Sequence, residues 1–459
     1  MYKINFNQPI HVHFIGIGGI SMSGLAEILL KENFTISGSD AKESALTQHL
    51  EELGATVFYG QKASNIIEGI DAVVYTAAIH EDNEEFAEAK RQGLPMLSRA
   101  ELLGQLMTNY EMPIAVSGTH GKTTTTSMLS HILLADEQDP TISVGGILKA
   151  IGGNIRVGDS EVFVTEACEY TNSFLHFFPK IAVILNIDAD HLDFFKDLQD
   201  IRNSFRRFAE LLPADGTLII SDEIPNIQEI TEGLACEIIT FGMNPSADYS
   251  VAHLTHNGEG DASFDVVKHG GPAGHIDLSV TGDHNVLNAL AAIATADRMG
   301  ISIDSMQKGL ASFRGTNRRF EYKGERNGFT IIDDYAHHPT EIRATLTAAE
   351  HYPHRELWYV FQPHTYTRTK ALFDEFVDAL SGAQHIVLAD IYAARETDTL
   401  GVSSKQLAEA LKARGCDAYY LPTFEAIEEF FLENCKNGDV LITMGAGDVV
   451  NIGEYLLKN

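Results

Sequence analysis

The sequence has few cysteines and no long apolar run. Its four cysteines, Cys168, Cys236, Cys416 and Cys435, are scattered and form no close pair of the kind that builds a zinc site or a redox motif. We therefore expect reduced thiols without a catalytic role. The longest apolar runs, such as Ile181 to Leu185, have the length of a strand and fall far below the ~20 residues of a membrane span. We expect a chain that does not cross a membrane.

The sequence also lacks an export signal and an excess of basic residues. No basic segment followed by an apolar segment and a cleavage site opens the chain, so we expect a cytoplasmic location. Its 33 basic residues are outnumbered by 64 acidic ones, which gives a formal net charge of −31. Such a charge repels nucleic acid and anionic lipid, and we expect neither as a partner. A phosphate-bearing ligand must therefore be held by local groups.

The length and pattern of the chain predict several domains. The 459 residues, 44% of them hydrophobic and 21% charged, suit two to four globular domains. Short apolar runs alternate with segments of helical period from end to end, which is typical of parallel sheets covered by helices. This pattern restarts near Pro113 and again after Phe320. We predict three α/β domains, at residues 1–112, 113–322 and 323–459.

Apolar runs predict the main strands of the two outer domains. In the first domain we expect strands at Val12–Ile17, Phe34–Ser37, Thr56–Tyr59 and Ala72–Tyr75. In the third domain we expect strands at Phe329–Asp333, Leu357–Phe361, His385–Asp390 and Val440–Met444. Residues 242–274 are polar and glycine-rich with alternating apolar positions, which predicts an antiparallel excursion at an edge of the central sheet.

A glycine loop in the central domain carries the strongest functional signal. It follows a strand expected at Ile114–Val116, precedes a helix expected at Thr124–Leu134, and consists of Gly118, Thr119, His120, Gly121, Lys122, Thr123 and Thr124. Loop amides and a helix N-terminus converge on one point, which suits a triphosphate. Lys122 would neutralise the β and γ phosphates and the Thr123 hydroxyl would bind Mg²⁺. A glycine-rich turn with a chance Lys-Thr is the alternative, and the strand-loop-helix context argues against it.

A second glycine loop opens the first domain. Gly16, Gly18, Gly19, Ser23 and Gly24 follow the first expected strand, and Ser39 with Asp40 follows the second. On its own this fingerprint indicates a dinucleotide, with the acidic residue on a ribose. It leaves open an NAD(P)-dependent oxidoreductase.

The central loop is two residues shorter than the common P-loop, and its form, GT-x-GKT[ST], resembles the Mur ligase and folylpolyglutamate synthetase superfamily. Residues 186–193, NIDADHLD, resemble the family's N-x-x-x-D-H-x-D stretch, and Glu166 ends the strand expected at Val162–Thr165. The resemblance implies Mg²⁺ or Mn²⁺ bound by Thr123, Glu166 and His191. Three nearby carboxylates, Asp188, Asp190 and Glu169, stay open between solvated groups and supporting ones.

Other residues that resemble the family imply an ATP site shared by two domains. Residues 282–288, GDHNVLN, resemble the element that holds adenine, through His284, Asn285 and Asn288. The same segment could also cap a helix, through Asp283 or Asn285. By resemblance Arg319 reaches the ATP phosphates from the interdomain linker, and Asp334 contacts the ribose from the third domain.

Within the family the resemblance is strongest to the alanine-adding members. It rests on residues 16–24, 37–40, 166–169, 334–341 and 361–369. It implies that the first glycine loop, with Ser39 and Asp40, holds the diphosphate of a UDP-sugar, and that Tyr335, His364 and Arg368 lie nearest the amino acid. Two positions depart from the pattern, Ala336 for glycine and Thr365 for arginine, and residues 204–208 lack the carbamylated lysine of later Mur ligases.

The resemblance implies three domains: a Rossmann-like N-terminal domain, a central P-loop ATPase domain with a mostly parallel sheet, and a Rossmann-like C-terminal domain. It implies an ATP-dependent ligase that joins L-alanine to UDP-N-acetylmuramic acid through an acyl phosphate, with Lys122, Glu166, His191 and Arg319 as the catalytic group. We expect a monomer or a homodimer. The rivals are a ligase that recycles a preformed peptide onto the same sugar nucleotide, the oxidoreductase, and a non-catalytic nucleotide-binding regulator.

Overall fold

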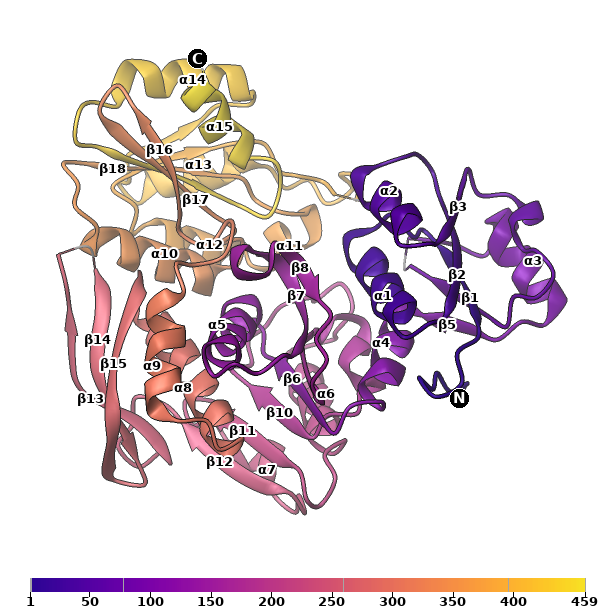
Figure 1. Cartoon of the computed structure of the whole chain (residues 1–459). Coiled ribbons are helices and arrows are strands. Elements are labelled where there is room, and N and C mark those ends of the chain that lie inside the picture. The colour runs from indigo at the N-terminus through magenta and orange to yellow at the C-terminus, as the bar shows by residue number, and fades with distance from the viewer. Residues whose placement is uncertain (1, 77, 259, 395, 459) are drawn as a thin grey trace.

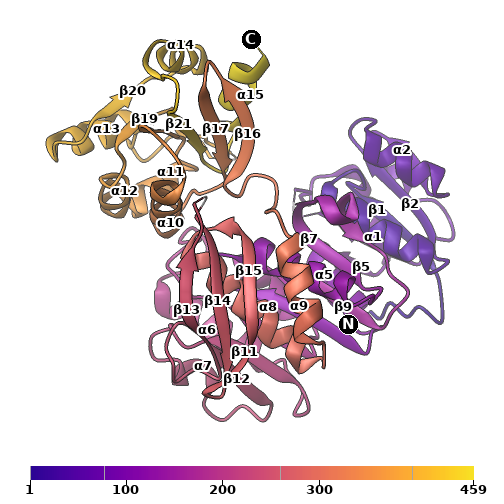
Figure 2. The ribbon, with the colours of Figure 1, turned by 60° about the vertical axis from the view of Figure 1, so that its left-hand side comes forward.

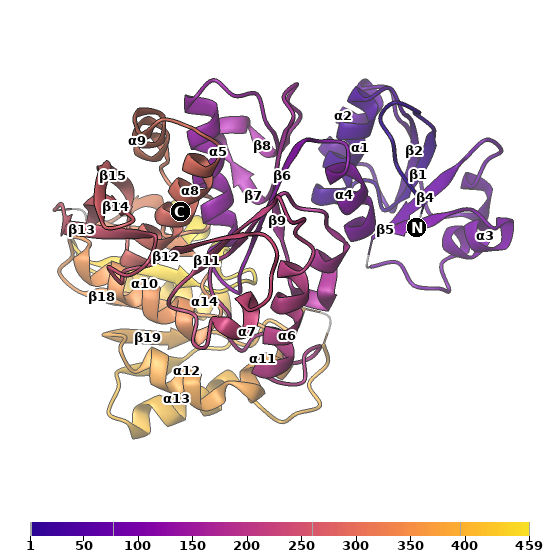
Figure 3. The ribbon, with the colours of Figure 1, turned by 90° about the horizontal axis from the view of Figure 1, so that it is seen from below.

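The computed structural model describes residues 2–76, 78–258, 260–394 and 396–458. It contains three sheets, one in each of three bodies that follow one another along the chain (Figure 1). Both the first and the third body pack against the central one, and the views from the side and from below show them at separate places on it (Figures 2 and 3). The fold is therefore three-domain α/β, as predicted.

The first domain is a parallel sheet of five strands in the order β3-β2-β1-β4-β5. The strands are β1 (His11–Ile15), β2 (Thr35–Asp40), β3 (Thr56–Tyr59), β4 (Ala72–Tyr75) and β5 (Met96–Ser98). The helices are α1 (Ile20–Lys31), α2 (Ala45–Glu52), α3 (Glu84–Gln92) and α4 (Arg99–Met107), with a 3₁₀ turn η1 at Ala63–Asn65. The strand order reverses between β1 and β4, and ligands of such sheets bind at the carboxyl ends of strands at that point. The first glycine loop follows β1 and lies there.

The central domain has ten strands in the order β15-β14-β13-β12-β11-β10-β6-β9-β7-β8. Its strands are β6 (Met112–Ser117), β7 (Thr141–Leu148), β8 (Gly153–Arg156), β9 (Val162–Ala167), β10 (Ile181–Ile184), β11 (Thr217–Ser221), β12 (Glu237–Phe241), β13 (Tyr249–His256), β14 (Asp261–Lys268) and β15 (Gly271–Thr281). Its helices are α5 (Lys122–Ala135), α6 (Leu198–Ala209), α7 (Gln228–Thr231), α8 (Asp283–Arg298) and α9 (Ile303–Ser312), with η2 (Lys149–Ile151) and η3 (Tyr170–His176). The strands from β12 to β7 pair in parallel, whereas β13–β14, β14–β15 and β7–β8 are antiparallel pairs. The antiparallel excursion predicted at a sheet edge is confirmed.

The third domain has six strands in the order β16-β17-β21-β18-β19-β20. They are β16 (Glu321–Arg326), β17 (Phe329–Asp334), β18 (Leu357–Phe361), β19 (His385–Leu388), β20 (Ala418–Tyr420) and β21 (Val440–Met444), and β16–β17 is the antiparallel pair. The helices are α10 (Pro339–His351), α11 (Tyr366–Ala371), α12 (Phe373–Leu380), α13 (Ser404–Ala413), α14 (Phe424–Asn434) and α15 (Val450–Lys458).

The bounds of several elements differ from the sequence prediction. The strand expected at His385–Asp390 ends at Leu388, and the helix expected from Thr124 begins at Lys122 because Gly121, with φ of 84°, forms its N-cap. The four cysteines are free, as expected. Within the described parts of the chain, no helix combines the length and the apolar character that crossing a bilayer requires.

Among the residues that the structure describes, one hydrophobic cluster spans the first two domains, whereas none spans the central and third domains. One buried cluster runs from the first sheet through α4 to the face of the central sheet that carries α6. The other face of the central sheet packs against α5, α8 and α9. The third sheet has clusters of its own on both faces. The third domain therefore meets the central domain through polar contacts, which are described below.

The linker into the third domain is anchored by one arginine. The Arg318 guanidinium donates to the Asp333 carboxylate at 2.9 Å and to the carbonyls of Gly445 and Gly447 at 2.7 and 3.0 Å. Its neighbour Phe320 packs on the core of the third domain. On the other side of the linker, Phe313 is buried in the central domain.

Candidate active site

Three neighbouring strand ends of the central sheet bring the predicted ATP and metal residues together. Ser117 at the end of β6 pairs with Ile184 of β10 and Ala167 of β9. The glycine loop follows β6, Glu166 lies near the end of β9, and the 186–193 segment follows β10. Because carboxyl ends of parallel strands meet at one sheet edge, residues far apart in the chain share one site.

The glycine loop is fastened to the 186–193 segment. The amides of Thr119 and His120 donate to the Asn186 backbone carbonyl at 3.2 Å and its side-chain oxygen at 2.8 Å. The side-chain amide of Asn186 donates in return to the His120 carbonyl at 3.1 Å. These two loop amides are therefore not aimed at a ligand, contrary to our expectation of several converging loop amides. The α5 N-terminus, where Gly121 makes no side-chain cap, is the part of the loop placed for a phosphate.

Lys122 does not point into open solvent. Its ammonium donates to Glu169 at 2.9 Å and also to the carbonyls of Gly118 and Thr119. Burial would lower the pKa of Lys122, but Glu169 outweighs burial and holds it above the usual value, so the lysine is charged. Glu169, which the sequence left undecided, is thus a buried counter-ion of the P-loop lysine.

Two of the predicted metal residues, Glu166 and His191, lie near the charged Lys122. Glu166 accepts from the Gly145 amide and the Thr123 hydroxyl, and burial raises its pKa. His191 stacks on the Tyr170 ring at 4.5 Å, and its Nε2 atom lies 3.8 Å from Oε1 of Glu169. That buried oxygen has no hydrogen-bond partner among the described residues. An unpartnered carboxylate oxygen facing an imidazole nitrogen fits a hard divalent cation.

A cavity of about 650 Å³ lies between the central and third domains. Eight of the twelve residues predicted to bind ATP line it: His120, Gly121, Thr124, His284, Asn285, Asn288, Arg319 and Asp334. The other four, Gly118, Thr119, Lys122 and Thr123, belong to the same loop but not to this lining. The volume of the cavity lies in the range of small-molecule and cofactor sites.

The motif predicted to hold adenine does not act as a side-chain cap. Gly282 forms the N-cap of α8 without a side-chain hydrogen bond, so capping by Asp283 or Asn285 was a wrong expectation. The Asn285 amide instead donates to the Thr281 carbonyl at 2.8 Å, and the Asn288 amide donates to Oδ1 of Asn285 at 3.0 Å. Both asparagines are held in place at the wall of the cavity.

The third domain contributes a buried carboxylate and an arginine to the cavity. Asp334 accepts from the backbone amides of Phe320 and Ala336 at 2.9 and 2.7 Å, and burial raises its pKa to about 6. The Arg319 guanidinium lies over the Tyr335 ring at 5.2 Å and 3.7 Å from Glu341. A buried hydrogen-bond acceptor and a guanidinium thus line the same cavity.

A smaller cavity of about 170 Å³ contains two of the three residues predicted for the amino acid. His364 and Arg368 line it together with Asp190 and His191 from the central domain. Arg368 donates to Asp190 at 3.0 Å, and its Nη1 atom lies 3.0 Å from Nδ1 of His364. Arg368 lies in α11, which begins at Tyr366.

Tyr335 is not part of that smaller lining. It lies between the two arginines of the linker and His337, whose ring is 5.4 Å away. His337 in turn lies 6.0 Å from the His364 ring. The structure therefore joins Tyr335 to the other two residues through a histidine that the sequence did not single out.

The first glycine loop is held by its own acidic residue. Asp40 accepts from the Gly18 amide at 2.9 Å with one oxygen and from the Ala41 amide at 2.8 Å with the other. A Cβ atom at Gly24 would lie 2.3 Å from the Ile155 side chain of β8, so any side chain at this position would require Ile155 to move. Ser23 donates to the Ile20 carbonyl and Ser39 to Glu85.

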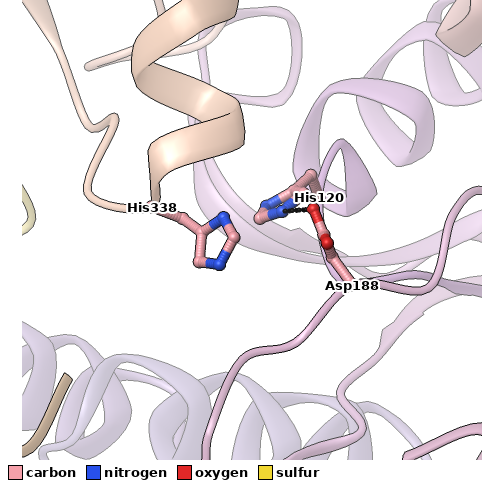
Figure 4. Close-up of side chains that lie close together, drawn as sticks. All are labelled: His120, Asp188 and His338. Atoms are coloured by element: carbon pink, nitrogen blue, oxygen red, sulfur yellow. Dashed lines mark hydrogen bonds and ion pairs between the residues drawn. The ribbon is translucent and has the colours of Figure 1, made fainter. Parts of the chain in front are cut away.

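Figure 4 shows three side chains, His120, Asp188 and His338, whose potential ligand atoms lie within 4.8 Å of one another. Their nitrogen atoms already have partners. His120 lies 3.3 Å from Asp188 and 3.1 Å from Glu341, and Nε2 of His338 lies 3.1 Å from the Ala189 carbonyl. Hydrogen bonds within the protein therefore account for this trio, which fits a contact between domains better than a metal site.

Family models match the chain in three consecutive parts. They are described as Mur ligase family, catalytic domain, over residues 11–111, Mur ligase middle domain over 116–296, and Mur ligase, glutamate ligase domain, over 318–447. The chain is also 62% identical over 458 residues to the UDP-N-acetylmuramate–L-alanine ligase of Agathobacter rectalis, and the match covers all of both chains. The chain belongs to the Mur ligase family.

Solved structures of the family share the whole architecture of this Mur ligase. The UDP-N-acetylmuramate-alanine ligase MurC from Thermotoga maritima superposes with a TM-score of 0.79 at 29% identity and covers 98% of each chain. The murein peptide ligase mpl from Psychrobacter arcticus superposes with a TM-score of 0.69 at 26% identity, again over 98% of each chain.

Sequence reasoning left Glu169 undecided and gave no role to Glu341 or Arg99 of this Mur ligase. Glu169 pairs with the P-loop lysine, Glu341 contacts the glycine loop and the linker, and the partly buried Arg99 donates to Ser21 beside the first glycine loop at 3.1 Å. Glu169 and Glu341 lie within the segments 166–169 and 334–341 that carry the family resemblance. No signal in the sequence marks Arg99 as different from a surface arginine.

Proposed function

We propose that the protein is an ATP-dependent ligase that forms the amide bond between UDP-N-acetylmuramic acid and L-alanine in the synthesis of peptidoglycan precursors. The observation that carries the proposal is that segment 186–193 contributes to both cavities: Asn186 and Asp188 line the larger one, and Asp190 and His191 the smaller. A nucleotide in the first and an amino acid in the second would meet at this segment. The full-length identity to the ligase of A. rectalis supports the same assignment.

The reaction needs alignment and charge neutralisation more than covalent chemistry from the protein. The lactyl carboxylate of the sugar nucleotide attacks the γ phosphate of ATP, which gives an acyl phosphate and ADP. The amine of alanine then attacks the acyl carbon, and phosphate leaves through a tetrahedral intermediate. Lys122 and Arg319 stabilise the charge on the transferred phosphoryl group, and His284, Asn285, Asn288 and Asp334 hold the nucleoside.

We assign Thr123, Glu166 and His191 to a divalent cation, with Mg²⁺ as the expected ion and Mn²⁺ as a substitute. The chemistry of the donor set, a hydroxyl, a carboxylate and an imidazole, supports this assignment, and so does the unpartnered Glu169 oxygen that lies 3.8 Å from His191. When bound, the ion supplies charge neutralisation for ATP and the acyl phosphate.

We assign the diphosphate of the sugar nucleotide to the first glycine loop, at Gly16, Gly18, Gly19, Ser23 and Gly24 with Ser39 and Asp40. The position of the loop at the carboxyl end of β1 supports this site. We assign alanine to Tyr335, His364 and Arg368. We propose the domain ranges 1–112, 113–322 and 323–459, and the nucleotide substrates favour a cytoplasmic location.

Mass spectrometry of the products tests the function. The protein is incubated with ATP, Mg²⁺, UDP-N-acetylmuramate and alanine, and we expect the sugar nucleotide to gain the mass of one alanyl residue while ADP and phosphate appear. A parallel reaction with a preformed tripeptide tests the recycling ligase as the rival. AMP and pyrophosphate as products, or ligation of the tripeptide alone, would contradict the proposal.

The Glu166→Gln variant tests the metal assignment. It keeps the shape of the side chain but removes one negative charge, so we expect a large fall in rate that raised Mg²⁺ partly restores. The measurement is turnover as a function of Mg²⁺ concentration. A Mg²⁺ dependence equal to that of the wild type would remove Glu166 from the metal site.

A further inference from the structure

Glu341 is the residue at which three parts of the site meet. It lies in the first turn of α10 at the boundary between the third and central domains, where its side chain is 11% exposed. Its oxygen Oε1 lies 3.1 Å from Nδ1 of His120 in the glycine loop and 3.7 Å from Nη1 of Arg319 in the linker. Its oxygen Oε2 lies 3.1 Å from Nδ1 of His337.

The contact between Glu341 and His337 connects Glu341 to the residues proposed to bind alanine. His337 lies edge-on to Tyr335, and its ring is 6.0 Å from His364. One carboxylate therefore contacts the P-loop on the central domain, the arginine proposed for the phosphates, and the histidine beside the residues proposed for the amino acid. No other residue described above contacts the P-loop, this arginine and this histidine together.

Glu341 makes more contacts than its role in capping α10 requires. Glu341 closes a capping box: its Oε2 atom accepts from the His338 amide at 3.3 Å and the His337 amide at 3.0 Å. A capping box needs one side-chain oxygen, and glutamine serves as well as glutamate. The second oxygen, turned to His120 and Arg319, is not needed for the cap.

The charge of Glu341 is maintained although the side chain is mostly buried. Burial would raise its pKa, but His337 and His120 outweigh burial and hold the pKa well below its usual value. Asp188 adds a parallel contact, because it accepts from Thr340 at 2.6 Å while it pairs with His120. The glycine loop and the start of α10 are thus joined by an ionic contact through His120.

We propose that Glu341 is a positioning residue that couples docking of the third domain to the orientation of the P-loop and of Arg319. Its contact with His120 sets the distance between the glycine loop and α10, and its contact with His337 sets the alanine site relative to that loop. The inference rests on the proposed ligase function. It predicts a loss in the reaction step and in alanine use, with nucleotide binding preserved.

The test uses two matched glutamine substitutions in the full chain. Glu341→Gln keeps the capping oxygen and removes the charge. Glu101→Gln makes the same change at the capping box of α4, where Glu101 accepts from the Ser98 amide at 2.7 Å in the first domain. Thermal unfolding, ATP affinity by calorimetry, and kcat and KM for ATP and alanine are measured for both variants and the wild type.

We expect Glu341→Gln to lower kcat by ~10- to 100-fold and to raise the KM for alanine, since small misplacements of reacting groups have effects of that size. ATP affinity should stay close to that of the wild type, and the unfolding temperature should change no more than in Glu101→Gln. Glu101→Gln should retain wild-type kinetics. Equal kinetics in the two variants, or a loss confined to ATP affinity, would overturn the positioning role.

Two further measurements keep the test decisive. If Glu341→Gln unfolds at a lower temperature than its control, the kinetics of Glu341→Asp are measured instead. Aspartate keeps the charge but is too short to make both sets of contacts. A wild-type kcat in Glu341→Asp would overturn the proposal. In a cycle with His120→Asn, we expect the effects on kcat not to multiply, and independent effects would contradict the coupling. Failure of the wild type to ligate alanine would instead overturn the proposed function.

Discussion

At the scale of single residues, the structure changes what is expected of the P-loop lysine. From the sequence Lys122 is an exposed loop residue whose removal costs little stability. In the structure it is the counter-ion of the buried Glu169 carboxylate. Removing one partner of a buried pair leaves the other charge uncompensated, which costs about 3–5 kcal/mol.

We therefore predict that Lys122→Ala loses both turnover and stability. The double variant Lys122→Ala/Glu169→Gln should regain most of the lost unfolding free energy, because no unpaired charge remains, but it should stay inactive. Denaturant unfolding and product formation are measured in parallel. An active double variant would show that Lys122 is not the phosphate ligand, and a Lys122→Ala variant as stable as the wild type would contradict the buried pair.

His120 predicts a dependence of stability on pH. Burial would lower the pKa of His120, but hydrogen bonds to Asp188 and Glu341 outweigh burial and raise the pKa to about 9. A histidine whose folded pKa lies above its unfolded value contributes stability that is fully present below pH ~6.5 and lost as the pH rises through 9. The loss over this window is about 3 kcal/mol.

Thermal unfolding from pH 6 to 9.5 measures this contribution. The wild type should lose stability across the window, and His120→Asn should lose much less. The control is His269→Asn, which removes an exposed histidine paired with Asp248 and should keep the wild-type profile. Parallel pH profiles for wild type and His120→Asn would show that the histidine is not charged in the folded protein.

At the scale of elements, apolar patterning predicted strands more accurately than it predicted contacts. The strands at Thr56–Tyr59, Ala72–Tyr75, Leu357–Phe361 and Val440–Met444 have the expected bounds, because each is a short apolar run between turn residues. The polar contacts of the site, such as Arg368 with Asp190 or His120 with Glu341, join residues more than 170 positions apart. Sequence periodicity carries no information about such pairs, because they form only when separate domains dock.

The first turns of α11 and α5 show the same limit within the site. Thr365 and Gly121 are the N-caps of these helices and have positive φ values of 65° and 84°. Motif matching does not predict such backbone angles. The motifs therefore gave candidate residues but not their partners. The role of Glu169 stayed undecided, and Glu341 and Arg99 received no role, for that reason.

The start of α11 allows a sharper prediction for the amino-acid site. Arg368→Ala should lower kcat/KM for alanine by ~30- to 1000-fold, or about 2–4 kcal/mol, because guanidinium binds both oxygens of a carboxylate. Arg368 also pairs with Asp190 across the domain boundary. Alanine kinetics and ATP affinity are measured for Arg368→Ala and for Asp190→Asn, which breaks the same pair from the other side. Equal losses of alanine use in both variants would assign Arg368 to the interdomain contact alone.

At the scale of the whole molecule, the two outer domains are attached in different ways. The first domain shares a hydrophobic cluster with the central domain, whereas the third contacts it through residues such as His120, Asp188 and Glu341. Burial of apolar surface holds domains firmly, whereas polar interfaces permit relative motion. The third domain is thus the one expected to open and close around ATP.

We predict that nucleotide stabilises the central and third domains together. A ligand at 100 times its dissociation constant adds about 2.7 kcal/mol to the state that binds it. Scanning calorimetry with Mg²⁺ and ADP should therefore raise the unfolding temperature of both domains by several degrees, and Arg319→Ala should reduce that shift. UDP-N-acetylmuramate should instead raise the unfolding temperature of the first domain. An ADP shift confined to the first domain would contradict the location of the ATP site.

The anchoring of Arg318 determines where such a motion can pivot. Arg318 is bound to the third sheet through Asp333, Gly445 and Gly447, and Phe313 is buried in the central domain, so we expect residues 314–317 to absorb a rotation between the two domains. Arg319 lies beyond that pivot and travels with the moving body. If the third domain closes, the cation proposed for the phosphates and the pocket proposed for alanine would therefore move together, and we would expect the proposed acyl phosphate to meet its acceptor with little exposure to water.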